Sequence, residues 1–189
     1  GTTPGAEPYL DGNDVVFNKA DGGTFRSARV NTGEQWDDSA YSTKLIAANY
    51  FRASADSAAA GGQFTFGTAA TGEYRSPRDG DGHGSHTSST AGGNFGVDTV
   101  VEGVALGKFS GVAPAAKIAA YKACWSGPDV DSTDDDGCFG GDLLAATERA
   151  IADGVDVINF SIGGGAATTT FDVQDEAFLN AAAAGIFVA

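Results

Sequence analysis

The sequence predicts an α/β domain with three layers, in which a parallel sheet lies between helices on both of its faces. The first observation is the order of patterns after residue 114, where short apolar runs alternate with helical periodicity as strand, helix, strand, helix, strand. Crossovers between such strands are right-handed, so they give a parallel sheet with the helices packed on its faces. The second observation is a hydrophobic content of 42% over 189 residues, which is enough for the core of one domain.

The first 76 residues are predicted to form an irregular, insertion-rich N-terminal part. Residues 1–43 are rich in Gly, Asp, Asn and Thr, and within them only the run 14–17 (DVVF) has the pattern of a short strand. Residues 44–51 (KLIAANYF) have the apolar density of a buried strand. Residues 53–77 are rich in small side chains, so we expect an exposed loop there.

Residues 77–189 are predicted to contain the α/β core. The expected elements are a strand at 116–124, a helix at 140–154, a strand at 155–161 that runs into a glycine turn, a helix at 172–185 and a strand from 186. Gly154 and Gly185 are placed to end the two helices, and Asp172 lies near the start of the second. In parallel sheets, binding sites form at the carboxyl ends of the strands, so the glycine turn after residue 161 is predicted to lie at a functional edge.

The charge balance limits the classes of partner. The chain has 11 Lys and Arg against 25 Asp and Glu, a formal net charge of −14. Phosphates would be repelled by this charge, so we expect neither nucleic acid nor an anionic membrane as a partner. No apolar run approaches the ~20 residues that span a bilayer. The chain begins with GTTPG and contains no Met, so we expect a processed or excised piece whose export signal was removed or lies outside it.

Both histidines of the chain, His83 and His86, lie in one glycine-rich segment, DGHGSHTSSTAGG (81–93). Gly, Ser and Thr disfavour an isolated helix, so a helix here would depend on tertiary packing, and its small side chains would allow burial at the centre of a domain. Such a helix presents His83 at its start. A buried structural histidine and a metal site with Asp79 or Asp81 are the alternatives. We expect no metal, because a recognisable third ligand is missing.

This segment resembles the histidine motif of the subtilisin-like serine peptidases, the subtilase family, in which Asp/Asn-x-His-Gly-Thr/Ser-His is followed by small residues on a central helix. GVAPAAKIAAYKACW (111–125) and DGVDVINFSIGG (153–164) resemble two further motifs of the family, in the family's order. GCFGGDLLAATERAIADG (137–154) is similar to the plant-type, pyrolysin-like branch. The resemblance covers about residues 42–189. It implies a subtilisin-like fold, here truncated, and makes residues 1–189 a partial catalytic domain.

The resemblance also implies a role for each matching residue. His83 corresponds to the catalytic histidine, and His86 to a second, structural one. The strand that ends in Ser161, Ile162, Gly163 and Gly164 would pair with an extended peptide substrate. These four residues would also form a wall of the pocket for the side chain before the scissile bond.

Cys124 and Cys138 flank a polar loop whose ends could meet. From the residues alone they are either a disulfide or two unrelated buried thiols. The pyrolysin-like branch carries a cysteine pair in the matching YKACW and GCF segments, so the resemblance favours the disulfide.

Three parts of the family's machinery have no match in the chain. The catalytic aspartate of the family lies in a strand-end Asp-Thr/Ser-Gly, and neither Asp11 nor Asp14 follows an apolar strand. The Gly-Thr-Ser motif of the nucleophile and the oxyanion asparagine are absent as well. We expect all three outside residues 1–189, and we expect this piece alone not to hydrolyse peptides.

The resemblance therefore implies a fragment of a secreted serine endopeptidase, made as a zymogen, that uses no cofactor. Its expected partners are a peptide or protein substrate and its own inhibitory propeptide. The alternative is an inactive secreted domain that binds peptides or calcium. The run DVDSTDDDG (129–137) has the carboxylates that calcium prefers, but it departs from the EF-hand pattern at Thr133 and Asp134, so we expect a solvated acidic loop.

Overall fold

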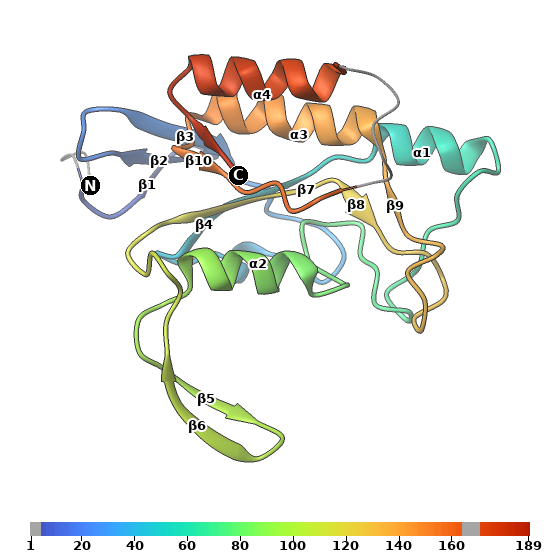
Figure 1. Ribbon diagram of the computed structural model, residues 1–189, viewed down its shortest axis with the longest axis horizontal. Coiled ribbons are helices and arrows are strands. Elements are labelled where there is room, and N and C mark those ends of the chain that lie inside the picture. The colour runs from blue at the N-terminus through green and yellow to red at the C-terminus, as the bar shows by residue number, and fades with distance from the viewer. Residues whose placement is uncertain (1–4, 164–170) are drawn as a thin grey trace.

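A computed structural model describes residues 5–163 and 171–189. The molecule has the three predicted layers: parallel strands lie in the middle, α2 covers one side of them, and α3 and α4 cover the other (Figure 1). In chain order the elements are β1 (Tyr9–Asp11), β2 (Asp14–Asn18), β3 (Thr24–Ala28), a short 3-10 helix (Asp38–Ala40), β4 (Leu45–Tyr50), α1 (Ala53–Ala60), α2 (His83–Gly92), β5 (Val97–Val101), β6 (Val104–Phe109), β7 (Ile118–Lys122), β8 (Cys124–Trp125), β9 (Gly137–Cys138), α3 (Gly140–Asp153), β10 (Val157–Ile158), α4 (Val173–Ala183) and β11 (Phe187–Val188).

The parallel strands form two pairs, β4 with β7 and β10 with β11. Tyr121 of β7 packs against a buried cluster that comprises Ala150 of α3, Ile158 of β10, Ala181 of α4 and Ile186. This cluster joins the second strand pair and both helices to β7. The α/β class with helices on both faces is therefore confirmed.

Helices α3 and α4 follow the local signals in the sequence. The backbone of Gly154 is left-handed, with φ of 77°, directly after the last residue of α3. Asp172 caps α4, because its carboxylate accepts hydrogen bonds from the N–H groups of Gln174 and Asp175. In the described part of the chain, no helix is long and apolar enough to cross a membrane.

The N-terminal 43 residues are more regular than predicted. The expected strand at 14–17 is present as β2, but β1 and β3 pair with it on either side to form an antiparallel sheet. In β3, Phe25 and Ser27 are buried while Thr24 and Arg26 are exposed, which is the alternation of a strand with one face on a core. Val15 and Phe25 of this sheet pack against Ile46 and Ala47 of β4, so this region shares a core with the parallel strands.

The expected exposed loop at 53–77 begins instead with helix α1. Its first N–H groups, those of Ser54 and Ala55, donate to the buried carboxylate of Asp142 at 2.9 and 3.0 Å. Asp142 belongs to the first turn of α3, so the group that stabilises the start of α1 comes from a distant part of the sequence. Local composition could not reveal this contact.

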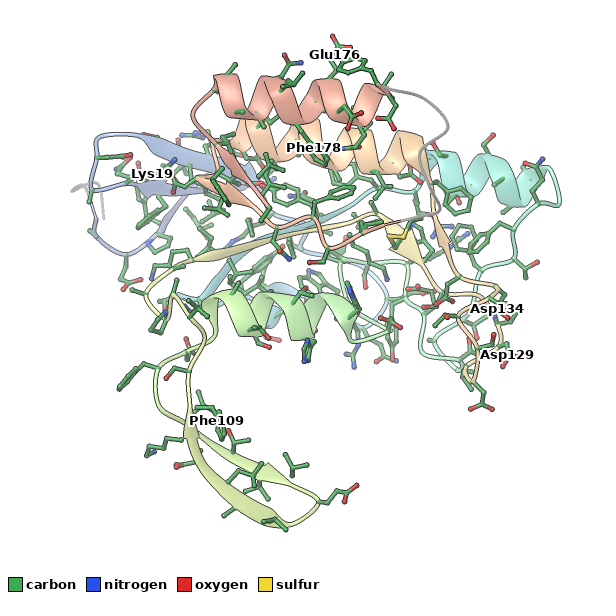
Figure 2. All side chains as sticks on the ribbon, in the orientation of Figure 1. Lys19, Phe109, Asp129, Asp134, Glu176 and Phe178 are labelled. Carbon is green, nitrogen blue, oxygen red and sulfur yellow. A yellow bond between two sulfur atoms is a disulfide. The ribbon has the colours of Figure 1, made fainter. Side chains whose placement is uncertain are left out.

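The sequence analysis also missed the β5–β6 hairpin. Glu102 and Gly103 form its two-residue turn with positive φ values of 49° and 81°. The hairpin projects from the body of the molecule below α2 (Figure 1), and Phe109 lies at its base (Figure 2). Most of its large apolar side chains are exposed.

Candidate active site

His83 is the first residue of helix α2. Gly82 precedes it with φ of 93°, a left-handed conformation that glycine adopts without strain. His83 and His86 are both exposed, so each imidazole is accessible to another molecule or chain segment. The helix and the position of His83 at its start therefore agree with the sequence analysis.

Two aspartates fix the start of α2. The carboxylate of Asp79 accepts hydrogen bonds from the N–H groups of Gly82 at 2.8 Å and Ser85 at 2.7 Å. The carboxylate of Asp81 accepts from the N–H of His83 at 2.9 Å. A helix leaves these N–H groups without partners inside itself, and negatively charged acceptors are favoured at its N-terminus. The backbone that carries His83 is thus tied to its own preceding loop.

The electrostatics of Asp79 reflect this arrangement. Burial by itself raises the pKa of the Asp79 carboxyl. Hydrogen bonds from Ser85 and Gly82, and then the positive charge of Lys122, act in the other direction and outweigh burial. The net pKa of Asp79 therefore lies below its ordinary value, and the ionised form is the one that caps the helix.

The polar side chains of α2 bond back to the helix itself. The hydroxyls of Thr87, Ser88 and Thr90 donate to carbonyls four residues earlier, at 3.1, 2.7 and 2.9 Å. These bonds give the hydroxyls partners in a helix of poor intrinsic propensity.

The expected burial of α2 is found only at its C-terminal end. A Cβ atom on Gly92 would lie 2.8 Å from Cδ1 of Ile118 in β7, so a larger residue there would have to displace the end of that side chain. The rest of α2 is exposed or half-buried. In the described part of the chain, the expected burial at the centre of a domain is therefore not found for most of the helix.

The expected substrate strand follows β10. The Ser161 hydroxyl and the Asn159 amide form two hydrogen bonds with each other, at 3.0 and 3.2 Å. Ser161, Ile162 and Gly163 are exposed, and no hydrogen bond joins their backbone to another described residue. Gly164 lies outside the described residues. No hydrogen bond between described residues links this segment to His83, so the structure does not by itself test whether they form one site.

The predicted disulfide between Cys124 and Cys138 is present and joins the paired strands β8 and β9. It closes the loop that carries Asp129 and Asp134, which lie at the edge of the molecule (Figure 2). Among residues 5–163 and 171–189, no three or more His, Cys, Asp or Glu side chains are grouped so that they could hold a metal ion. Asp79 and Asp81, the alternative ligands, instead bond through their carboxylates to N–H groups at the start of α2.

Two charged residues near α2 were missed by the sequence analysis. Lys122, at the carboxyl end of β7, forms an ion pair with Glu73, which is only 4% exposed. The Lys122 ammonium also donates to the carbonyl of Arg78, immediately before Asp79, at 2.9 Å. A lysine within the apolar run IAAYKAC was the one available signal, because a charged residue in a buried strand usually has a partner.

Comparison with known proteins agrees with the motifs. The model of the subtilase family matches residues 20–189. The subtilisin-like protease SBT1.6 of Arabidopsis thaliana is 45% identical over 148 residues, which are 77% of this chain and 18% of that protein. SBT1.5 of the same plant is 38% identical over 155 residues, 82% of this chain and 18% of the relative. SBT5.4 is 47% identical over 124 residues, 65% of this chain and 14% of the relative.

The chain thus spans less than a fifth of the length of these curated relatives. Within that span, the family match covers β3 to β11 and includes α2 with both histidines. Its relatives are plant subtilisin-like proteases, as the pyrolysin-like segments indicated. The protein belongs to the subtilase family.

Proposed function

We propose that the parent protein of this chain is a serine endopeptidase in which His83 is the general base. The observation that carries the proposal is the position of His83. The chain belongs to the subtilase family, and His83 is an exposed histidine at the first position of helix α2. The start of this helix is held by Asp79 and Asp81. A general base needs an accessible imidazole at a fixed position, and this arrangement supplies both.

The proposed reaction is acyl transfer through a serine and an aspartate in the rest of the parent protein. His83 takes the proton from the serine hydroxyl as the serine oxygen bonds to the substrate carbonyl carbon. The imidazolium then gives this proton to the departing amine, which leaves an acyl-enzyme. In the second half of the reaction, His83 takes a proton from a water molecule as the water oxygen bonds to the acyl carbon. His83 then returns this proton to the serine oxygen as the product acid is released. No cofactor is needed, because the imidazole carries each proton.

The substrate in this proposal is an extended peptide. Exposed backbone at Ser161, Ile162 and Gly163, with Gly164 following, supports the addition of a substrate strand by main-chain hydrogen bonds. For His86 we propose a structural role, although its exposed imidazole makes no hydrogen bond with a described residue.

We also propose that the parent protein is secreted and is held inactive by its own propeptide before maturation. The Cys124–Cys138 disulfide supports secretion, because disulfides persist mainly in oxidising compartments. The net charge of −14 supports a protein or peptide partner over a nucleic acid or an anionic membrane.

The test is peptide hydrolysis by the mature parent protein and two histidine variants. We expect His83→Ala to lower kcat/KM by at least about 10,000-fold, because the serine then has no base. His86→Ala, one turn further along the same helix, is the matched control and should keep kcat per active molecule close to wild type. Full hydrolysis by His83→Ala would overturn the proposal. Peptide binding without hydrolysis by the wild-type protein would support an inactive binding domain instead.

A further inference from the structure

A largely buried ion pair, Lys122 with Glu73, holds the loop that leads into α2. We propose that Lys122, held by Glu73, is a positioning residue for His83: it fixes the loop 73–82 and through it the start of α2. This inference rests on the proposed role of His83 as the base. It assigns to the Lys122–Glu73 pair a part in the reaction that requires no contact with the substrate.

The hydrogen bonds of the Lys122 ammonium all reach the same loop. Its ammonium pairs with the carboxylate of Glu73 and donates to the carbonyls of Arg78 at 2.9 Å and Tyr74 at 3.4 Å. The ammonium also lies 4.4 Å from the centre of the Trp125 ring, a cation–π distance. Lys122 is the last residue of β7, so the loop is held against the end of a strand in the parallel sheet.

Glu73 gives the pair a rigid partner. One carboxylate oxygen accepts from the N–H of Ser126 at 2.6 Å, and the other accepts from the N–H of Tyr74, also at 2.6 Å. With Lys122, the carboxylate therefore has three donors, which is the condition under which a buried charge is tolerated. The Glu73 carboxylate is thus bonded to Lys122, at the end of β7, and to Ser126, directly after β8.

The route from Lys122 to His83 is short and continuous. Arg78, whose carbonyl accepts from Lys122, is followed by Asp79, whose carboxylate caps α2. Gly80, the next residue, crosses the backbone so closely that a Cβ atom there would lie 2.1 Å from the carbonyl oxygen of Gly72. The segment is thus tightly packed at Gly80 and tied to α2 by the carboxylates of Asp79 and Asp81, so a displacement of Arg78 would be passed on to the start of the helix.

The small stability expected of a buried ion pair argues that the Lys122–Glu73 pair serves mainly to fix geometry. Burial lowers the pKa of the Lys122 ammonium, and the neighbouring carboxylates of Glu73 and Asp79 oppose that shift while Arg52 adds to it. A buried ion pair often adds little stability compared with apolar residues of similar volume, because both charges lose hydration. What it does supply is geometry, and here every hydrogen-bond acceptor of Lys122 belongs to the segment that leads to His83.

Lys44 offers a matched control in the same pair of strands. It is half-buried, like Lys122, and its ammonium donates to the carbonyls of Pro114 and Ala116. It precedes β4, whereas Lys122 ends β7, so the two lysines lie at opposite ends of the β4–β7 pair. Lys44→Met and Lys122→Met remove the same charge and donors, but only the second change reaches the histidine loop.

The experiment measures kcat and KM of the mature full-length protein, with active sites counted by titration with a fluorophosphonate. We expect Lys122→Met to lower kcat by about 10- to 100-fold with KM changed by less than about 3-fold, because a small displacement of a reacting group has effects of this size. Lys122→Arg should recover part of the loss, and Lys44→Met should keep kcat within about 3-fold of wild type. Glu73→Gln should lower kcat in the same direction, and combining it with Lys122→Met should add little.

Each outcome decides the matter. A kcat for Lys122→Met equal to that of Lys44→Met, or a loss that disappears once active sites are counted, overturns the inference. If Lys122→Met does not mature, Glu73→Gln decides, and an unchanged kcat in that variant also overturns it. The inference is separable from the function it rests on. Activity retained by His83→Ala refutes the function, whereas an inactive His83→Ala beside a fully active Lys122→Met refutes only the positioning role.

Discussion

Asp79 combines two roles at the scale of single residues. It caps α2 through the N–H groups of Gly82 and Ser85, and its charge lies near the ammonium of Lys122. A sequence shows that an aspartate precedes a helix, which is a common helix-start signal. It does not show that Lys122, 44 positions after Arg78, bonds to the Arg78 carbonyl beside this aspartate, because that contact depends on how the strand and the loop fold together. The histidine could therefore be predicted from the sequence, but its support could not.

The lowered pKa of Asp79 has a consequence for stability. Its folded pKa lies below the ordinary value of 3.8, so the ionised cap stabilises the folded state above that pH. The contribution is lost as the pH falls through the folded pKa. We expect Asp79→Ala to lower the free energy of unfolding by about 1 kcal/mol at neutral pH, as for other helix caps. The difference from wild type should shrink as the pH falls below 3.8.

Thermal unfolding of the fluorophosphonate-inactivated parent protein, followed from neutral to acidic pH, measures this difference without interference from autolysis. Asp131→Ala removes the same charge from the exposed acidic loop and serves as the control. A destabilisation by Asp79→Ala that stays constant, or grows, as the pH falls below 3.8 would show that the cap does not depend on the ionised carboxylate.

At the scale of elements, helices α3 and α4 and strands β4 and β7 could be predicted because their signals are local: helical periodicity with a terminal glycine for α3 and α4, a capping aspartate for α4, and short apolar runs for the strands. Helix α2 has poor local propensity, and its prediction rested on the resemblance of the histidine segment to the subtilase motif. Helix α1 and the β5–β6 hairpin could not be predicted in this way. The start of α1 is bonded by a carboxylate 87 and 88 positions away, and the hairpin has too few buried side chains to show a strand pattern. Strand β10 is shorter than expected, with two paired residues.

Removal of the Asp142 carboxylate tests this account of α1. In Asp142→Ala, the N–H groups of Ser54 and Ala55 lose their acceptors in a buried setting, which costs about 1–3 kcal/mol for an unsatisfied group. We expect faster amide hydrogen exchange at the start of α1 and lower stability of the parent protein. Glu148→Ala, at an exposed position of the same helix α3, should leave both unchanged. Equal exchange rates in the two variants would contradict the tertiary cap.

At the scale of the whole molecule, the described chain exposes many large apolar side chains. Figure 1 shows the β5–β6 hairpin standing away from the layers of the body. Eight large apolar residues on and beside this hairpin are at least half exposed: Phe95, Val97, Val100, Val101, Val104, Leu106, Phe109 and Val112. Phe171 and Phe187 are exposed on the body. Contiguous apolar surface of this kind marks an interface or a site of aggregation.

We therefore expect the 189-residue chain on its own to self-associate, with the hairpin as one contact. Sedimentation velocity should show oligomers or aggregates, because exposed strands and apolar surface favour pairing between chains. Val104 and Leu106 are both exposed on β6, so Val104→Lys with Leu106→Lys should reduce association. A wild-type chain that sediments as a monomer and unfolds in one cooperative transition would contradict this expectation.

The central claim is that His83 is the base that activates a serine nucleophile. The most direct measurement is the rate at which a fluorophosphonate labels the mature parent protein, because labelling reports the activated serine without requiring peptide turnover. The account predicts that His83→Ala slows labelling by about 100- to 10,000-fold, while His86→Ala labels at nearly the wild-type rate. Labelling of His83→Ala at the wild-type rate, or no labelling of the wild-type protein, would contradict it.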